Sequence, residues 1–303
     1  MGLKLHTWII ENKLAQSPLP NLSEINKLSK YFTGVVVLTM QHEMPLIYID
    51  KLLENGLDVL HLPTFDHHPV DLLDLLRAIL FIEKHIREGG AVLVHCYGGV
   101  GRSGLTTSAY LVYKGLNLYD AVKYVRSKVP GSLENQWQLQ ILEDLYTLIN
   151  TVGSHMINEF MKFVNKLSTN DVVSYKHLSK VLQFTIELYN ILEFAKDVDL
   201  KKETESSMIH IHREDFYVEI VNSLGLKEIN ESLLANLSHT LDYTMDSRVV
   251  VLYDRHIDKP EVMLLCRDNC NDIATVFLQE LRKYSHIITD IPDVYWDIFL
   301  NYV

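Results

Sequence analysis

A single cysteine begins a glycine-rich stretch whose residues could together hold and attack a phosphate group. The stretch reads VLVHCYGGVGRSG from Val92 to Gly104, so Cys96 follows an apolar run and Arg102 comes six residues later. Glycines permit backbone angles and close approaches that side chains prevent, which lets successive N–H groups point at one anion. A helix beginning near Ser103 would add the positive end of its dipole. The spacing therefore predicts a cradle for a tetrahedral oxyanion.

Each side chain of this stretch suits one part of phosphoryl transfer. A thiol beside an arginine and a helix N-terminus loses its proton readily, so we expect Cys96 to attack phosphorus as a thiolate. Arg102 can give two N–H bonds to phosphate oxygens, which a lysine cannot do equally. Ser103 is expected to donate its hydroxyl to the sulfur, and His95 to hold the loop through its backbone. The residues expected to line the phosphate site are Tyr97, Gly98, Gly99, Val100 and Gly101.

The elements around this stretch indicate an α/β domain. The apolar runs TWII, GVVVLT, LDVLHL and AVLVH are strand-like, and they alternate with helical patterns such as NLSEINKLSKYF and the segment opening at Pro69. Three further helical patterns follow the cysteine, near 103–113, 118–128 and 134–149. This alternation predicts a central sheet flanked by helices over residues 1–150.

A second, acidic domain is expected after a break near NTVGSH. Residues 151–303 hold fifteen basic and twenty-four acidic residues, a net charge of −9, whereas residues 1–150 carry −2. Their mixed helical and strand-like patterns, including a probable hairpin in RVVVLYDRHIDKPEVMLLC, predict an α+β domain of unknown role. It could recruit a basic partner or restrain the first domain, or it could simply keep the protein soluble.

Composition narrows the class of protein. The net charge of −11 argues against a nucleic-acid partner, and no apolar run approaches the ~20 residues that a membrane span requires. The three cysteines, Cys96, Cys266 and Cys270, give no disulfide framework and fit a reducing compartment. We therefore expect a cytoplasmic protein, and the phosphoryl transfer expected of Cys96 and Arg102 requires no metal and no cofactor.

The run His-Cys-x-x-Gly-x-x-Arg-Ser, from His95 to Ser103, resembles the signature of the cysteine-dependent protein tyrosine phosphatases. Over about residues 5–150 the chain is similar to their dual-specificity branch, including the opening segment WIIENKLAQSPLP. The resemblance implies a hydrolase that cleaves phosphotyrosine in proteins through a phosphocysteine intermediate. The long N-terminal recognition loop of the tyrosine-specific enzymes has no obvious counterpart, which implies that phosphoserine and phosphothreonine are accepted too.

The resemblance also implies a general acid and a substrate contact. The family carries an aspartate on a loop some thirty residues before the cysteine, and Asp66 in LHLPTFDHHPVDLL matches it, with Asp71 and Asp74 as competing choices. Family members have a glutamine near the start of the last helix, for which Gln138 is the best match by offset. Asn135 and Gln136 remain open at this point, and an ordinary exposed helix face would explain all three. The family's usual arginine before this segment is Val129 here.

Two other functions compete with a protein phosphatase. Relatives with the same loop act on phosphoinositides or RNA 5′-phosphates, but they usually carry extra lysine or arginine in the loop, and YGGVG has none. A module that binds phosphoproteins without turnover typically lacks the cysteine or the acid, whereas this chain keeps Cys96 and Asp66. The sequence therefore favours the enzyme.

Overall fold

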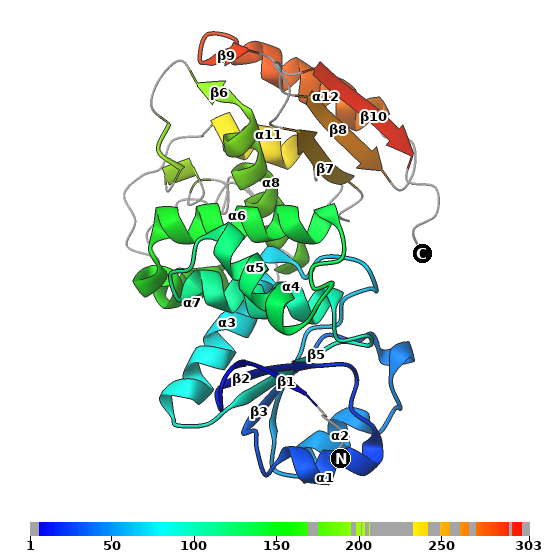
Figure 1. Ribbon diagram of the computed structural model, residues 1–303. Coiled ribbons are helices and arrows are strands. Elements are labelled where there is room, and N and C mark those ends of the chain that lie inside the picture. Colours follow the sequence, from blue (N-terminus) through cyan, green and yellow to red (C-terminus); the bar gives the residue numbers. More distant parts are fainter. Residues whose placement is uncertain are drawn as a thin grey trace. The chain divides into compact units, whose positions relative to one another are not determined.

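The computed structural model describes most of the chain, with gaps in its second half. The described residues are 6–168, 175–194, 198–200, 202–203, 206, 233–241, 249–254, 261–266, 271–290 and 293–298. The chain divides into two compact units, Met1–Asn158 and Glu159–Val303. Each unit has its own sheets and helices and is considered separately below (Figure 1).

The first unit is built on a five-stranded sheet. Its strands are β1 (Thr7–Ile10), β2 (Leu14–Ser17), β3 (Gly34–Val37), β4 (Asp58–His61) and β5 (Val92–His95). They lie in the order β1-β2-β5-β3-β4, and only the β1–β2 pair is antiparallel. Both faces of β3 and β5 are buried, as expected for the continuous apolar runs of a parallel sheet.

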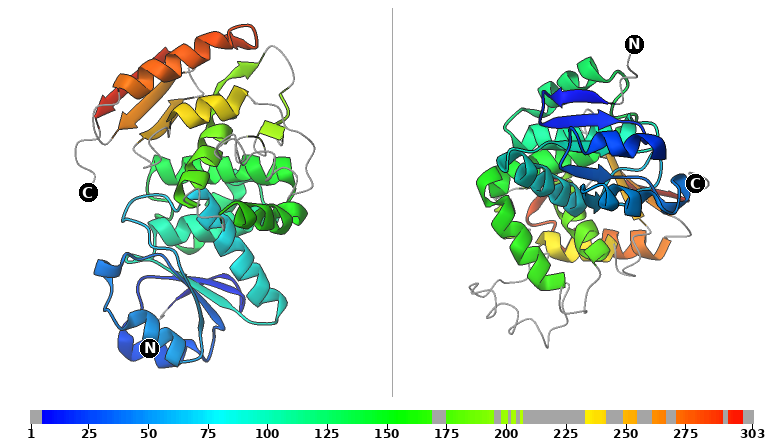
Figure 2. Two further views of the ribbon diagram at one scale, coloured as in Figure 1. Left: turned by 180° about the vertical axis from the view of Figure 1, so that it is seen from behind. Right: turned by 90° about the horizontal axis from the view of Figure 1, so that it is seen from below.

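Helices cover both faces of this sheet, which confirms the predicted architecture. The helices are α1 (Ile25–Leu28), α2 (Tyr48–Glu54), α3 (Leu72–Arg87), α4 (Gly101–Tyr113), α5 (Leu118–Lys128) and α6 (Gln136–Val152), with 3-10 turns at Leu22–Glu24, Gln41–Glu43 and Ser154–Met156. Residues of α1 and α2 share one core with the side chains that β2, β3 and β5 direct to their side. The helices α3 to α6 lie on the opposite side of the sheet (Figures 1 and 2).

The four parallel strands bring three loops to one edge of the sheet. Because β2, β3, β4 and β5 run in the same direction, their carboxyl ends meet there, with Ser17 and Val37 both opposite His95 and His61 opposite Val37. In parallel α/β sheets this is the edge at which ligands usually bind. The segments that follow β3, β4 and β5 can therefore build a site there, next to the end of β2.

The second unit is an α+β arrangement. Its elements are α7 (Ile157–Ser168, whose first two residues belong to the first unit), α8 (Tyr175–Ile191), β6 (Glu193–Phe194), α11 (Leu233–Leu241), β7 (Val249–Asp254), β8 (Glu261–Cys266), α12 (Asn271–Lys283), β9 (Ile288–Asp290) and β10 (Asp293–Ile298). The predicted hairpin is the antiparallel pair β7–β8, and β10 adds to β8 in parallel. Side chains of α8, α11, α12 and β8 form its apolar core.

The state of the cysteines differs from the expectation. Cys96 is a free thiol, but Cys266, buried at the end of β8, is disulfide-bonded. The sequence predicted no disulfide framework, and a single bridge is not a framework, but Cys266 is not the free thiol that a reducing compartment favours. No described helix is both long and apolar enough to cross a membrane.

Candidate active site

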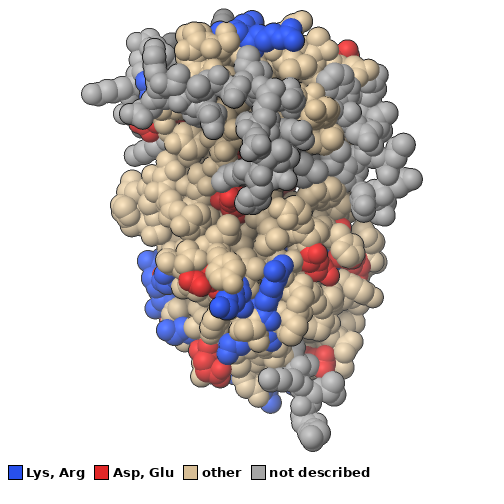
Figure 3. Space-filling view, turned by 45° about the horizontal axis from the view of Figure 1, so that its top comes forward, with Lys and Arg blue, Asp and Glu red and all other residues tan. Residues whose placement is uncertain are grey.

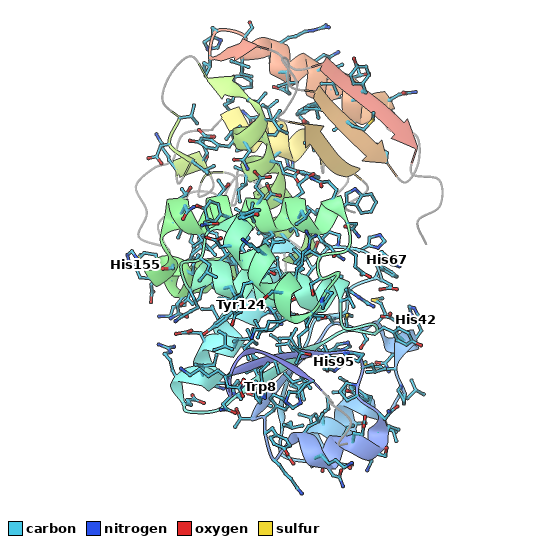
Figure 4. The ribbon with its side chains drawn as sticks, viewed as in Figure 1. Trp8, His42, His67, His95, Tyr124 and His155 are labelled. Carbon is cyan, nitrogen blue, oxygen red and sulfur yellow. The ribbon has the colours of Figure 1, made fainter. Side chains whose placement is uncertain are left out.

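The loop between β5 and α4 holds Cys96 at the carboxyl edge of the first unit's sheet. Figure 4 shows His42, from the segment after β3, and His67, from the segment after β4, on the same side of this unit. The contacts described below join both segments to Arg102, which follows β5. The site is thus assembled from the three loops that the parallel strands bring to one edge.

Gly99 fixes the shape of the loop. Its φ is +73°, in the left-handed region, and a Cβ at this position would collide with the backbone of Ser17 and Pro18 at the end of β2. Only glycine meets both conditions without strain. The resulting turn directs the Gly99 N–H to the sulfur of Cys96, at 3.2 Å.

The sulfur of Cys96 is nearly enclosed and has two hydrogen-bond partners. The residue is 2% exposed, and its Sγ lies 3.4 Å from the hydroxyl oxygen of Ser103 in the first turn of α4. Together with the Gly99 N–H, the hydroxyl can stabilise negative charge on the sulfur. The first turn of α4 adds its dipole, because the helix begins at Gly101. The arrangement suits a sulfur nucleophile.

His95 and Tyr48 support the loop from beneath. The His95 ring is fully buried, with Nδ1 3.4 Å from the carbonyl oxygen of Cys96 and Nε2 3.2 Å from the Tyr48 hydroxyl. Because a carbonyl only accepts, Nδ1 carries the proton and Nε2 accepts from Tyr48. Burial lowers the pKa of His95 to about 4, although its bond to Cys96 works against this. His95 is therefore neutral at physiological pH and positions the loop.

Arg102 is buried and ties the three loops together. Its Nη1 donates to the carbonyl of Thr64 at 2.6 Å and to a carboxylate oxygen of Glu43 at 2.7 Å, and Nη2 donates to Glu43 and Asp66, each at 2.8 Å. Burial works to lower the pKa of Arg102, but the bond to Glu43 and nearby negative charges outweigh it and raise the pKa. Its buried Nε has no hydrogen-bond partner among the described residues. One N–H donor of the guanidinium is thus left for an anion.

Glu43 is a site residue that the sequence did not indicate. It closes the 3-10 turn Gln41–Glu43 after β3, and its side chain is 11% exposed. Burial alone raises the pKa of Glu43, but hydrogen bonds from Arg102 and the Met40 N–H outweigh it and hold the pKa below 4.5. Glu43 is therefore ionised and neutralises part of the arginine's charge. Only its position after a strand adjacent to β5 could have drawn attention to it.

Asp66 reaches the site from the loop after β4. Its carboxylate is 54% exposed and lies 2.8 Å from Nη2 of Arg102. The next residue, His67, has a φ of +60°, and its carbonyl accepts a hydrogen bond from the Asn135 side chain at 2.7 Å. The ring of His68 lies 6.0 Å from that of Trp137 in α6. The start of α6 thus fastens the segment that carries Asp66.

The competing aspartates lie outside the site. Asp71 is the residue before the first turn of α3, and Asp74 lies in that turn and forms an ion pair with Arg77 at 2.9 Å. Among the three aspartates considered, Asp66 is the one that the structure places on the arginine.

Gln138 lies beside the loop rather than on an exposed helix face. It is fully buried, its Oε1 accepts the Glu134 N–H at 2.8 Å, and its Nε2 has no partner among the described residues. A Cβ at Gly101 would come within 2.8 Å of that Nε2. Asn135 instead caps α6 by accepting the Gln138 N–H at 3.0 Å. Tyr97, by contrast, is 58% exposed beside the site.

Part of the chain is similar to known proteins. Residues 21–147 match the family model described as dual specificity phosphatase, catalytic domain. The chain is 39% identical over 102 residues to dual specificity protein phosphatase Mpk3 of Drosophila melanogaster, covering 33% of this chain and 24% of Mpk3. It is 38% identical over 94 residues to dual specificity phosphatase 28 of Homo sapiens, covering 29% of this chain and 53% of that protein.

A solved structure is similar to about half of the chain. The crystal structure of Tk-PTP in the active form is 37% identical, with a TM-score of 0.46, and the match covers 47% of this chain and 97% of Tk-PTP. The chain therefore spans about a quarter of Mpk3 and about half of dual specificity phosphatase 28, but nearly all of Tk-PTP. The domain matched at residues 21–147 belongs to the dual specificity phosphatases of the cysteine-dependent protein tyrosine phosphatase superfamily.

Proposed function

We propose that the chain is a protein phosphatase that hydrolyses phosphotyrosine, and also phosphoserine and phosphothreonine, through a phosphocysteine intermediate. The observation that carries this proposal is the environment of one sulfur. Cys96 Sγ receives the Gly99 N–H and faces the Ser103 hydroxyl at the start of α4, and Arg102 nearby leaves its Nε free. This combination provides a nucleophile together with donors for phosphate oxygens.

The first step transfers the phosphoryl group to sulfur. The Cys96 thiolate forms a P–S bond as the P–O bond to the substrate breaks, and Arg102 and the loop N–H groups take up the charge on the equatorial oxygens. Asp66 gives its proton to the departing oxygen, which leaves as an alcohol or phenol. Asp66 is half exposed, so it can meet both substrate and solvent.

The second step releases inorganic phosphate. Asp66, now a carboxylate, takes a proton from a water molecule that attacks phosphorus, and the P–S bond breaks. The electron pair returns to Cys96, and the Ser103 hydroxyl, 3.4 Å from Sγ, stabilises the thiolate. Gln138, whose Nε2 is free beside Gly101, is the residue we assign to positioning this water or the phosphate. No step needs a metal or a cofactor.

The charges near the site favour a substrate with one phosphate over a phosphoinositide or an RNA 5′-phosphate. Among the described residues, Arg102 pairs with Glu43 and Asp66, and His67 lies beside Asp66 and Glu134. These pairs of the site include no lysine. On the face shown in Figure 3, the basic side chains in the lower half lie among acidic ones. Extra phosphates would therefore meet carboxylates rather than additional cations. The exposed rings of Phe65 and Tyr97 suit a protein surface.

The test is phosphate release without added metal from phosphotyrosine and phosphothreonine peptides and from a phosphoinositide. Cys96→Ser should abolish release, and Asp66→Asn should slow it by about 10²- to 10⁴-fold, the usual contribution of a general acid. A reduced wild-type protein that binds the peptides but releases nothing would instead be a binding module. Faster phosphate release from the phosphoinositide than from the peptides would show that the preferred substrate is a phosphoinositide and not a protein.

The function of the second unit is a prediction from its charge. The net charge of −9 over residues 151–303 fits recruitment of a basic partner or restraint of the catalytic cleft, and it fits equally a solvated surface that keeps the protein soluble. Comparing peptide hydrolysis by the full chain at low and high salt would test either role, because screening weakens contacts between exposed charges. Localisation in the cytoplasm likewise stays a prediction.

A further inference from the structure

We propose that Gln16 is a positioning residue that holds the phosphate loop in its anion-binding conformation. The inference rests on the proposed function and adds a residue to its machinery. Gln16 lies in β2, outside the signature stretch, and the sequence related its segment only to the fold. It is 1% exposed, although its side chain is polar and lies at the edge of the sheet where the site forms.

Both N–H donors and the carbonyl oxygen of the Gln16 amide have hydrogen-bond partners. Nε2 donates to the carbonyl oxygen of Gly99 at 2.8 Å and to the Ser132 hydroxyl at 3.2 Å. Oε1 accepts the hydroxyl of Thr107, in α4, at 2.8 Å. The amide cannot be turned over, because its oxygen would then face the Gly99 carbonyl. One side chain therefore connects β2, the phosphate loop, α4 and the segment before α6.

The bond to Gly99 decides which way the loop's peptide group faces. In a trans peptide the C=O and the following N–H point in opposite directions. By holding the Gly99 carbonyl on its own side, Gln16 directs the Val100 N–H away from itself, toward the anion cradle. A turned peptide would instead place a carbonyl oxygen in a site for phosphate, where it repels the substrate's charge.

Gly99 is the residue at which such a turn is easiest. Glycine has no Cβ, so its backbone adopts other conformations about as readily as the left-handed one. The Gly99 N–H reaches Cys96 only in that left-handed conformation, which the residue itself therefore does not enforce. Burial of a polar amide in this place costs free energy unless every bond is made. The contacts of Gln16 thus supply, from a neighbouring strand, the restraint that the glycine cannot supply.

The test compares Gln16→Met with the wild type and with a control, Tyr110→Phe. Methionine keeps the length and approximate volume of glutamine but removes the donor to Gly99. The control removes the 2.7 Å bond from the hydroxyl of Tyr110, near the end of α4, to Glu83 in α3, which does not involve the loop. Three quantities are measured for each protein: hydrolysis of p-nitrophenyl phosphate, inhibition by inorganic phosphate, and the rate at which iodoacetate alkylates Cys96.

For Gln16→Met we expect kcat/KM and the affinity for phosphate to fall by about tenfold or more, a part of the ~10²- to 10³-fold loss seen when an oxyanion donor is removed outright. Alkylation should slow as well. Tyr110→Phe should leave all three within about twofold, the size of effect expected when a residue does not touch the site. A Gln16→Met protein that folds and matches the wild type in phosphate affinity would overturn the proposal.

Gln16→Glu decides the matter if the methionine variant does not fold. A protonated carboxyl can donate to the Gly99 carbonyl and a carboxylate cannot. The activity of Gln16→Glu relative to the wild type at the same pH should therefore rise as the pH falls from 7.5 to 5.5, about the range in which a buried glutamate beside a carbonyl becomes protonated. A constant ratio would refute the positioning role. Wild-type protein without any turnover would refute the proposed function instead.

Discussion

Replacing Glu43 with glutamine tests how the buried guanidinium of Arg102 is held. Glu43 accepts two N–H bonds from Arg102, at 2.7 and 2.8 Å, and one from the Met40 N–H at 2.6 Å. Glutamine keeps one oxygen, and with that oxygen in the place of Oε2 one bond from Arg102 is lost and the other two become bonds to a neutral group. Since a bond to a charged group contributes about 1.5–3 kcal/mol and a neutral one about 1 kcal/mol, we expect the free energy of unfolding to fall by about 3 kcal/mol.

Calorimetric unfolding at pH 7 measures this change. For a domain of this size, about 3 kcal/mol corresponds to a decrease of roughly 6–12 °C in Tm. The control is Glu54→Gln, the same substitution in the exposed ion pair with Lys51, which should change stability by no more than about 0.5 kcal/mol. A loss below about 1 kcal/mol for Glu43→Gln would refute the view that this carboxylate holds the arginine.

The pH dependence gives a second check on the same pair. The pKa of Glu43 is held below 4.5, so its stabilising contribution is fully present above about pH 4.5 and is lost as the pH falls through the lower, folded-state pKa. The difference in stability between wild type and Glu43→Gln should therefore be constant near neutral pH and shrink in acid. A difference that stays the same at about pH 3 and pH 7 would show that charge is not its cause.

Three further predictions concern the loop and its supports. His95 should stay neutral down to about pH 4 in the folded protein, whereas the unfolded chain binds that proton near pH 6.5. The folded protein should therefore lose stability as the pH falls from about 6.5 to 4. NMR titration of the His95 ring checks this, and a midpoint near 6.5 would contradict it. Gly99→Ala should lower Tm and abolish hydrolysis of p-nitrophenyl phosphate, and a fully active, equally stable variant would refute the steric argument. Asn135→Ala should cost about 1 kcal/mol of stability through the lost cap. The same substitution removes the hydrogen bond to His67 and so loosens the segment that carries Asp66. It should therefore slow hydrolysis of an alkyl phosphate more than that of p-nitrophenyl phosphate, because the p-nitrophenolate leaving group needs less protonation. Equal slowing of both substrates would argue against a role of Asn135 in placing the acid.

The sequence was most informative where structure depends on neighbours along the chain. The apolar run before Cys96, the glycines after it and the helix that follows are local features, and the sheet flanked by helices was predicted from their alternation. The hairpin β7–β8 was predicted for the same reason. In each case the residues that form the element lie within one short stretch.

The parts that escaped prediction depend on segments far apart in the sequence. Glu43 reaches Arg102 across 59 positions, and Gln16 reaches Gly99 across 83, because β2, β3 and β5 are neighbours in the sheet. Neither residue belongs to a motif, and strand order cannot be deduced from the apolar runs alone. The disulfide of Cys266 escaped for a different reason, since the number of cysteines does not reveal whether two of them meet.

The most direct test of the account is to look for the phosphoryl group on Cys96. Wild-type protein is mixed with p-nitrophenyl phosphate, quenched in acid during turnover, digested and examined by mass spectrometry, with Cys96→Ser and an unmixed sample as controls. We predict that the peptide containing Cys96 gains the mass of one phosphoryl group only in the wild-type, mixed sample. Turnover at full rate by the wild type with no modified Cys96, or undiminished turnover by Cys96→Ser, would contradict the central claim.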